Sequence, residues 1–397
     1  MTHFAKTKAM FHLPDGMIYL DGNSLGPLPK AAVERVRTTM QDEWGEMLIT
    51  GWNKAGWMEQ TTTLADRIGR LIGAPAGSMV LGDTLSIKVY QALASALELR
   101  PQRKVILSDT GNFPSDLYMA DGLIRSLKQG HVLKTVAPED VAANINQDVA
   151  VLMLTEVGYG TGRMHDMAAL TKLAHDAGAL TVWDLAHSAG AIPVDVTGTG
   201  ADFAVGCTYK YLNSGPGGPA FIYVAPEHAD TARPALSGWL GHEAPFAFDP
   251  DYRPGQGIQS MRVGTPPVLQ LASLSASLDI WDQVDMQAVR ARSSQLTQLF
   301  IELVERSCPM LKLASPRDPS HRGSQVCFAF EQGYAVMQAL IARGVIGDFR
   351  APDIMRFGFT PLYIDADDVR AAVAILADIM ATDAWDTVEF KTKSKVT

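Results

Sequence analysis

The chain carries Leu180-Thr-Val-Trp-Asp-Leu-Ala-His187 and, further along, Cys207-Thr-Tyr-Lys-Tyr-Leu-Asn-Ser-Gly-Pro-Gly-Gly218, and these two stretches decide its fold. The first is a short apolar run that ends in the carboxylate of Asp184, a pattern that predicts a buried strand. In open α/β sheets, ligands bind in the crevice beyond the carboxyl ends of the strands. Asp184 is therefore expected in such a crevice.

On both sides of Asp184, short β-rich apolar runs alternate with longer helical patterns. Strands are expected at residues 104–108, 149–154 and 179–184, and helices at residues 117–127 and 167–177. This alternation is typical of βα units and of a mainly parallel sheet. The predicted fold class is α/β.

The segments that flank this region predict a second, smaller unit. Helices are expected at residues 30–43 and 60–71, a long helical stretch at residues 268–307, and a strand at residues 325–330. We expect a large domain over residues 50–265. A smaller α+β domain is expected to combine the C-terminal part, residues 266–397, with the N-terminal segment, residues 1–49.

Composition narrows the functional classes. The 397 residues are 47% hydrophobic and carry a formal net charge of −9, which gives no electrostatic reason to expect nucleic acid or an anionic membrane as partner. The three cysteines, Cys207, Cys308 and Cys327, form no zinc-binding pattern, so no metal is expected. The start of the chain does not resemble a signal peptide, and no apolar run approaches the roughly twenty residues of a membrane helix. A cytoplasmic protein is predicted.

Asp184, His187 and Lys210 together suggest pyridoxal 5'-phosphate (PLP) chemistry. A strand-end carboxylate can keep a pyridine nitrogen protonated, so that the ring acts as an electron sink. The aromatic neighbours of Lys210 favour the neutral amine that forms a Schiff base, and the glycines after it let the backbone approach a ligand. Taken singly, Asp184 could be a helix cap, Lys210 a solvated side chain and His187 a core histidine; their combination favours the cofactor.

Two further segments fit the same cofactor. Gly82-Asp-Thr-Leu-Ser-Ile-Lys-Val89 places hydroxyl residues at a predicted helix start, where free N–H groups suit a phosphate, although ordinary capping explains it equally well. Asn112-Phe-Pro-Ser-Asp116 follows the strand at residues 104–108, so Phe113 could stack on a pyridine face or be a core aromatic. Arg356 could recognise a substrate carboxylate or form a structural salt bridge. Of the tryptophans, one or two could line an aromatic substrate pocket.

At this point the motifs identify a family. The chain resembles the fold-type I PLP enzymes of the class V aminotransferase group and, within them, the kynureninase family. The resemblance covers nearly the whole chain, and its specific part is Asp-Leu-Ala-His at 184–187 with Tyr-Lys-Tyr-Leu-Asn at 209–213. The looser motifs are Tyr19-Leu-Asp-Gly-Asn-Ser-Leu-Gly26, the 112–116 segment and Met164-His-Asp-Met167.

The resemblance implies roles for individual residues. Lys210 binds the cofactor, Asp184 pairs with the pyridine nitrogen, and Tyr209 is the catalytic acid. Family members are homodimers, and Trp239 and Thr265 are expected from the neighbouring chain. Arg356, Trp52 and Gly264 are implied for the substrate. The cofactor-binding residues implied are Leu85, Ser86, Phe113, Pro114, Ser115, Asp116, Thr155, Asp184, His187, Tyr209, Lys210, Trp239 and Thr265.

The implied reaction is hydrolysis of the Cβ–Cγ bond of L-kynurenine to anthranilate and L-alanine. Family members that favour 3-hydroxykynurenine carry Ser-Asn before the Pro-Pro pair and a histidine near the substrate ring. Here these positions read Gly264-Thr265 and Trp52. A preference for unsubstituted kynurenine is therefore expected.

Three alternatives stay open on the same scaffold. A cysteine desulfurase needs a mobile nucleophilic cysteine, and neither Cys308, beside Pro309, nor Cys327, in an expected strand, is placed for that role. A class V aminotransferase would use the same lysine and aspartate. A PLP-fold binding protein without catalysis is disfavoured because Lys210, Asp184 and Arg356 are all retained.

Overall fold

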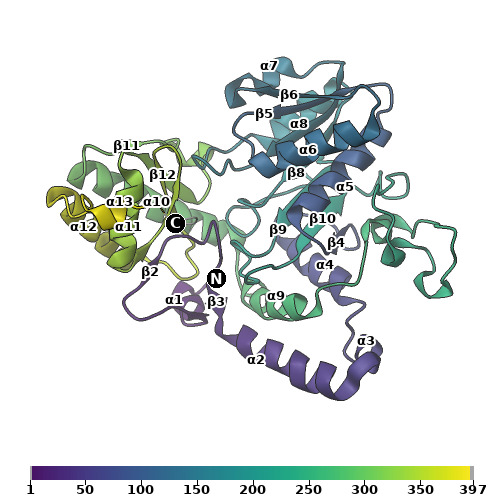
Figure 1. The fold of residues 1–397 in the computed structure, drawn as a ribbon, viewed down its shortest axis with the longest axis horizontal. Helices are drawn as coiled ribbons and strands as arrows, with labels where there is room; N and C mark the ends of the chain where they lie inside the picture. Colours follow the sequence, from purple (N-terminus) through teal and green to yellow (C-terminus); the bar gives the residue numbers. More distant parts are fainter. Residues whose placement is uncertain (1, 394–397) are drawn as a thin grey trace.

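A seven-stranded sheet forms the centre of the larger part of the molecule (Figure 1). The computed structural model describes residues 2–393. The four pairs that join β9, β8, β7, β5 and β6 are parallel, whereas β10 runs antiparallel to both of its neighbours, which confirms the mainly parallel sheet. In spatial order the strands are β4 (Met79–Leu81), β10 (Ala220–Val224), β9 (Phe203–Cys207), β8 (Leu180–Asp184), β7 (Val149–Thr155), β5 (Val105–Asp109) and β6 (Val132–Val136).

Both faces of this sheet are buried because successive strand residues enter two different cores. In β8, Val182 packs into the core beneath α5 and α6, and Trp183 packs into the larger core on the other face. This explains why the strands are continuously apolar in sequence. The helices of this region are α4 (Gln60–Ile72), α5 (Leu85–Glu98), α6 (Pro114–Leu127), α7 (Val141–Asn144) and α8 (Met167–Asp176).

The expected elements of the sheet region are present, with shifted ends. The helix expected from residue 117 begins at Pro114, since proline is well suited to the first helical position. The strand expected from residue 104 begins at Val105 and extends to Asp109. With these ends, Asp109, Phe113 and Asp116 lie at the carboxyl edge of the sheet.

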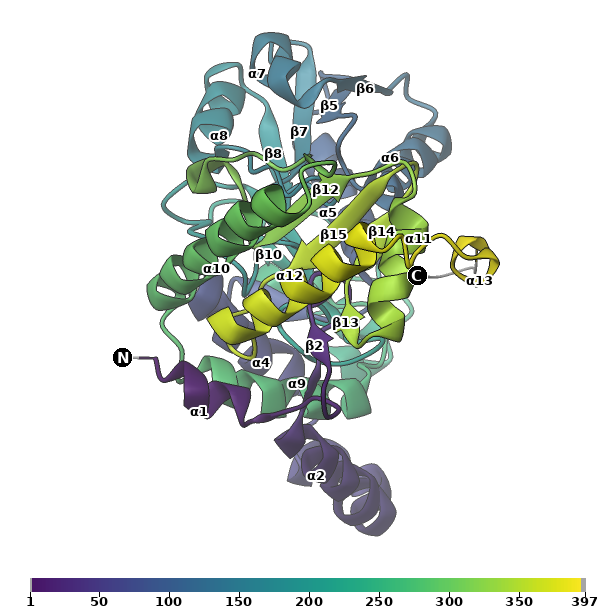
Figure 2. The same ribbon diagram turned by 90° about the vertical axis from the view of Figure 1, so that its left-hand side faces the viewer.

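A second, four-stranded antiparallel sheet lies beside the first (Figure 1) and faces the viewer in Figure 2. Its strands, in spatial order, are β11 (Lys312–Leu313), β12 (Gln325–Ala329), β15 (Ile354–Gly358) and β14 (Asp348–Arg350). The helices that accompany it are α10 (Met286–Ser307), α11 (Gly333–Ala342), α12 (Ala366–Ala381) and α13 (Val388–Lys391). This arrangement agrees with an α+β pattern in the C-terminal part; the exact domain boundaries stay a prediction.

The N-terminal segment joins the C-terminal part. Strand β2 (Ile18–Tyr19) pairs in parallel with β13 (Val345–Ile346), and the Thr7 hydroxyl donates to the Leu362 carbonyl over 2.9 Å. Nearby, α1 (Phe4–Lys8) precedes the two-strand pair of β1 (Phe11–His12) and β3 (Leu28–Pro29).

Two of the expected helices differ in form from the sequence interpretation. The expected continuous stretch over residues 268–307 is two helices, α9 (Val268–Trp281) and α10, because Asp285 caps the second by accepting from Gln287 N. The helix expected at 30–43 starts as α2 (Lys30–Thr38) and continues as the π-helix η1 (Thr39–Glu46). The remaining short helices are η2 (Leu48–Thr50), α3 (Gly51–Lys54), η3 (Pro138–Asp140), η4 (Trp239–Gly241), η5 (Pro245–Ala247), η6 (Gly257–Met261) and η7 (Pro319–His321).

Within residues 2–393, none of the helices combines the length and apolar character that crossing a bilayer requires.

Candidate active site

The loop after β9 holds Lys210 in a fixed place. The Thr208 and Ser214 hydroxyls lie 2.8 Å apart, and Ser277 donates to the Leu212 carbonyl over 2.6 Å. Gly26 also contacts this loop, donating its N–H to the Tyr209 carbonyl over 2.8 Å. A Cβ on Gly26 would lie 2.3 Å from the Lys210 carbonyl oxygen, so only glycine allows this approach.

His187 is the direct partner of the Lys210 amine. The distance from Lys210 Nζ to His187 Nε2 is 3.0 Å. Burial lowers the pKa of His187 well below its usual range, and the Lys210 charge lowers it further, so the imidazole is neutral. The ammonium form of Lys210 has only donors; in that state Nε2 accepts and the ring proton is on Nδ1. Nζ also lies 5.8 Å from the centre of the Phe113 ring and 6.0 Å from that of Tyr209.

A pair of buried carboxyl groups lies next to the lysine. Burial raises the pKa of Asp116 well above its usual range, and the neighbouring Asp184 raises it further. Burial also raises the pKa of Asp184, although the Ala186 N–H, which donates to Asp184 Oδ1 over 2.8 Å, favours the ionised form. Thr155 Oγ1 lies 2.5 Å from Asn112 Oδ1 and 3.5 Å from Asp184 Oδ2. The pKa of Asp116 is therefore the more strongly raised of the two.

The start of α5 offers free backbone N–H groups near these residues. Thr84 is extended and does not cap the helix with its side chain, and no acidic residue occupies the first turn. The Ser86 hydroxyl lies 2.9 Å from that of Ser115, which joins the two helix starts of α5 and α6. A helix start of this kind suits a phosphate because the N–H groups and the helix dipole both favour an anion.

These residues fit a pyridoxal phosphate group. The buried polar atoms without a hydrogen-bond partner among residues 2–393 include two from the groups described above, Asp116 Oδ2 and His187 Nδ1. Buried polar atoms are normally paired, so a bound ring with its own polar substituents would satisfy them. The amine of Lys210, the partly exposed ring of Phe113 and the open start of α5 supply the remaining contacts that such a group needs.

Arg356 is anchored by an acid that the sequence interpretation did not identify. Its Nε donates to Asp348 Oδ1 over 2.6 Å, and its Nη2 contacts Asp348 Oδ2. Nη1 donates to the Tyr159 carbonyl over 2.7 Å, and Nη2 donates to the Ser24 hydroxyl over 3.1 Å. These four contacts leave at least one of the five guanidinium N–H groups for a ligand. The salt bridge considered from sequence therefore exists, and it does not exclude carboxylate recognition.

Asp348 and Tyr159 are the main omissions from the sequence interpretation. Asp348 lies opposite Arg356 in the β14–β15 pairing, so a predicted hairpin register is the signal that could have found it. Tyr159 links two predicted residues, because its carbonyl accepts from Arg356 and its ring packs edge-on against Phe113 at 5.2 Å. The sequence around Tyr159 contains no motif that would predict this role.

Four predicted residues come from segments that contact one another. A Cβ on Gly238, which precedes Trp239, would meet the Val263 carbonyl, and Arg262 donates to the Met58 carbonyl over 3.1 Å. This places the segments that carry Trp239, Gly264 with Thr265, and Trp52 near one another. Among residues 2–393, no hydrogen bond or ring contact joins these four residues to Lys210, Asp184 or Arg356. Their assignment to the site stays a prediction.

All three cysteines are buried. Cys308 and Cys327 have no exposed surface, and burial raises the pKa of both thiols, to about 11 for Cys327. A thiol in that state is a poor nucleophile at neutral pH.

The fold and this site define the class of protein: the chain is a fold-type I PLP-dependent enzyme. Solved structures with the same fold include a cysteine desulfurase from Thermococcus onnurineus NA1, with a TM-score of 0.81, 20% identity and coverage of 96% of this chain and 99% of that one. A cysteine desulfurase from Escherichia coli gives a TM-score of 0.80 at 20% identity, with coverage of 96% and 99% respectively. At this identity the likeness concerns the fold alone.

Relatives of known name are far more similar in sequence. A kynureninase from Pseudomonas fluorescens is 50% identical over 99% of this chain and 96% of its own, and one from Burkholderia pseudomallei is 49% identical with the same coverage. The family model for the kynureninase C-terminal domain matches residues 289–376. The chain belongs to the kynureninase family and is a hydrolase of carbon–carbon bonds that uses pyridoxal phosphate.

Proposed function

We propose that the residues around Lys210 hydrolyse L-kynurenine to anthranilate and L-alanine, with each role carried by a group described above. Bound pyridoxal phosphate supplies an electron sink for the electron pair released at the substrate α-carbon. Lys210 would hold the cofactor, and Asp184 would accept a hydrogen bond from the pyridine nitrogen. Leu85, Ser86 and Tyr209 would bind the phosphate at the start of α5.

Lys210 is the proposed base for the substrate α-proton. Once released from the cofactor, its amine stands beside a neutral His187, which can accept a hydrogen bond and limit the spread of Nζ positions. A positioned amine within reach of the proton is the first requirement of general base catalysis.

Tyr209 is the proposed acid for the carbon that becomes the β-carbon of alanine. The neighbouring Cys207 and burial both raise the pKa of its phenol, so Tyr209 is protonated throughout the neutral range. A phenol in this state can give its proton to a carbanion and be reprotonated from solvent.

Arg356 is the proposed anchor for the substrate α-carboxylate. Its guanidinium is fixed by Asp348 and by the Tyr159 carbonyl, so little side-chain freedom is lost on binding. Both N–H groups of Nη2 are used by Asp348 and Ser24, so the second N–H of Nη1 is the one available to a carboxylate.

We further propose that unsubstituted kynurenine is preferred over 3-hydroxykynurenine. Gly264 has no side chain to contact a ring hydroxyl, and Trp52 packs edge-on against Trp57 at 5.5 Å, presenting an aromatic surface. A site built without polar partners gains nothing from the hydroxyl and must desolvate it.

A homodimer would bring the separated residues to the site. Phe113 and Trp239 are 39% and 41% exposed, which is high for aromatic residues with an expected cofactor role. If Trp239 and Thr265 act across an interface, mixing an inactive Lys210→Ala variant with a weakened Trp239→Ala variant should restore part of the activity. Cell fractionation would test the cytoplasmic location predicted from composition.

The observation that carries the proposal is the 3.0 Å contact between Lys210 and His187 beside the Asp184–Asp116 pair. The test is to load the protein with pyridoxal phosphate and follow anthranilate fluorescence from kynurenine. Higher kcat/KM for 3-hydroxykynurenine would overturn the preference but not the reaction class, and no anthranilate from either substrate would overturn both.

A further inference from the structure

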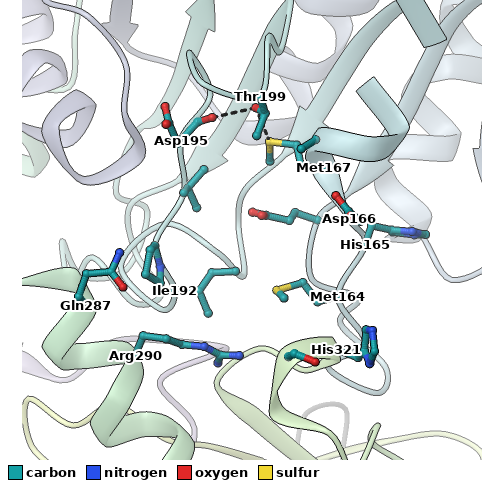
Figure 3. Close-up of a pocket in the computed structure, with 15 residues that line it drawn as sticks. Met164, His165, Asp166, Met167, Ile192, Asp195, Thr199, Gln287, Arg290 and His321 are labelled. Atoms are coloured by element: carbon teal, nitrogen blue, oxygen red, sulfur yellow. Dashed lines mark hydrogen bonds between the residues drawn. The ribbon is translucent and has the colours of Figure 1, made fainter. Parts of the chain in front are cut away.

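A cavity lies between the large sheet region and α10, and none of the predicted cofactor or substrate residues lines it. Its volume is about 660 Å³, within the range of small-molecule sites. Figure 3 shows side chains from the loop before α8, from the segment around Ile192, from α10 and from η7 converging on it. The lining residues are Glu156, Met164, His165, Asp166, Met167, Ala168, Ile192, Pro193, Val194, Asp195, Thr199, Gln287, Arg290, Ser320 and His321.

One wall of this cavity carries a cation without an acid to balance it. Arg290 donates from Nη2 to the carbonyls of Pro319 and Arg322, and among residues 2–393 no salt bridge to a carboxylate is found for it. Burial alone lowers the pKa of Arg290. Arg322 lies behind it, and burial together with the Arg290 charge lowers the pKa of Arg322 to about 10. Two neighbouring guanidinium groups make this wall attractive to an anion.

The lining of the cavity also includes a buried carboxyl group, that of Glu156. Glu156 follows β7, has 6% of its surface exposed, and its Oε2 has no hydrogen-bond partner among residues 2–393. The Ser188 hydroxyl is close but not in hydrogen-bonding geometry, and burial raises the pKa of Glu156 to about 7. A buried oxygen in this state is costly unless a ligand supplies a donor.

The other acids of the cavity lining form no salt bridge with Arg290 within residues 2–393. Asp166 and Asp195 are exposed, and they accept from the Ala169 N–H over 2.9 Å and from the Gly198 N–H over 2.7 Å respectively. His165 pairs with Asp109 over 2.7 Å. Among the lining residues, Arg290 therefore lacks an acid partner and Glu156 Oε2 lacks a hydrogen-bond partner.

Part of the remaining lining is apolar. Met164 and Met167 contribute thioether side chains that adapt to the shape of a ligand, and Ile192 and Val194 add branched aliphatic surface. Such a surface favours an aromatic or aliphatic body over a sugar or an inorganic anion.

We propose that this cavity is a second ligand site, which takes a small carboxylate with an amine donor at the other end of an apolar body. The carboxylate would pair with Arg290, the amine would donate to Glu156, and the body would contact the methionines. Aminoaryl carboxylates are the simplest members of this chemical class. The proposal does not depend on the reaction at Lys210.

The test uses holoenzyme whose Schiff base has been reduced with borohydride, so that amines cannot react with the cofactor. Titration calorimetry with 4-aminobenzoate should show one site per chain, with benzoate, which lacks the donor, and aniline, which lacks the anion, each binding at least about fivefold more weakly. Equal binding of all three compounds, or no binding of 4-aminobenzoate, would overturn the proposal.

Variants locate the binding. Ala168→Trp fills the cavity from an exposed position and should abolish binding, whereas Ala169→Trp, one residue along and outside the lining, should not. Arg290→Gln should weaken 4-aminobenzoate and benzoate alike by about tenfold, and Arg292→Gln on the same helix should leave both unchanged. In Glu156→Met, the advantage of 4-aminobenzoate over benzoate should disappear.

Circular dichroism and the melting temperature show which variants are folded, and only folded variants are compared. If Ala168→Trp binds 4-aminobenzoate as well as the parent protein does, the ligand sits elsewhere and the proposed site is wrong. If Arg290→Gln does not fold, the Ala168 and Ala169 pair still decides the question.

Discussion

Arg356 and Arg290 show two ways in which this chain uses a largely buried guanidinium. Arg356 is 2% exposed and is held at two positions by Asp348, a carboxylate that also pairs with Arg350 over 2.8 Å, so Arg356 has an acid partner before any ligand arrives. Arg290 contacts only backbone carbonyls, and no acid among residues 2–393 pairs with it. An arginine that already has an acid partner is held in a fixed geometry for catalysis, whereas an arginine without one keeps its charge available for a ligand. Arg356 at the Lys210 site is of the first kind, and Arg290 in the cavity is of the second.

The largest expected effect is on kcat, which should fall on substitution at the Lys210 site and not on substitution in the Arg290 cavity. Lys210→Ala should remove the visible absorption of the bound cofactor and lower kcat for kynurenine by at least about 10³-fold, because both the anchoring amine and the proposed base are lost. Arg290→Gln, the matched change in the other region, should keep kcat within about twofold. Steady-state anthranilate fluorescence measures both. Retention of cofactor absorption and activity in Lys210→Ala would break the assignment.

The next effect concerns the balance of charge at Arg356. Asp348→Asn should destabilise the protein by about 3–5 kcal/mol, because it leaves a buried guanidinium without its counter-charge. It should also raise KM for kynurenine more than it lowers kcat, since the arginine loses its fixed orientation. Urea unfolding and kinetics provide the two readouts.

The control for Asp348→Asn is Asp367→Asn, which breaks the exposed pair with Arg370. That change should cost no more than about 1 kcal/mol. Equal costs for the two substitutions would show that the Arg356 pair is not the buried, fixed contact described here.

Glu156, in the lining of the Arg290 cavity, should make the stability of the protein depend on pH. Its pKa of about 7 in the folded protein lies above the ordinary value of 4.5, so the folded state binds more protons than the unfolded state between these values. Stability therefore falls as the pH rises from about 4.5 to about 7, by up to about 3 kcal/mol. Glu156→Gln should lack this decrease, and exposed Glu98→Gln should keep it. If the free energy of unfolding changes by the same amount between pH 5 and pH 8 in the parent protein and in Glu156→Gln, the assignment is wrong.

The smallest expected effect concerns the substrate ring. Replacing Trp52 with His and Gly264-Thr265 with Ser-Asn should shift the ratio of kcat/KM values toward 3-hydroxykynurenine by about tenfold, since a polar site gains roughly 1–3 kcal/mol from a matched hydroxyl. An unchanged ratio in a folded, active triple variant would remove these positions from the specificity of the enzyme.

The sequence was most informative where one short motif carries several functional side chains. Asp184, His187 and Lys210 follow neighbouring strands, and the carboxyl ends of those strands meet at one edge of the sheet, so their proximity was predictable. The α/β class and the mainly parallel sheet followed from the same pattern.

Contacts between distant segments could not be predicted in this way. Asp348 reaches Arg356 only through the register of β14 and β15, and Tyr159 joins Phe113 to Arg356 from a loop without any distinctive pattern. The cavity around Arg290 depends on how α10 and η7 lie against the loop before α8, which no local pattern encodes. Trp239 and Thr265 form no hydrogen bond or ring contact with Lys210 within residues 2–393, and their predicted role depends on a second chain.

The most direct test of the central claim is a single-turnover measurement on the pyridoxal-phosphate-loaded protein and its Lys210→Ala variant. L-kynurenine is mixed with each protein, and anthranilate fluorescence is followed together with L-alanine. The account predicts one anthranilate and one L-alanine per active site in the parent protein and neither product in the variant. Formation of both products at a similar rate without Lys210, or transamination of kynurenine without release of anthranilate, would contradict it.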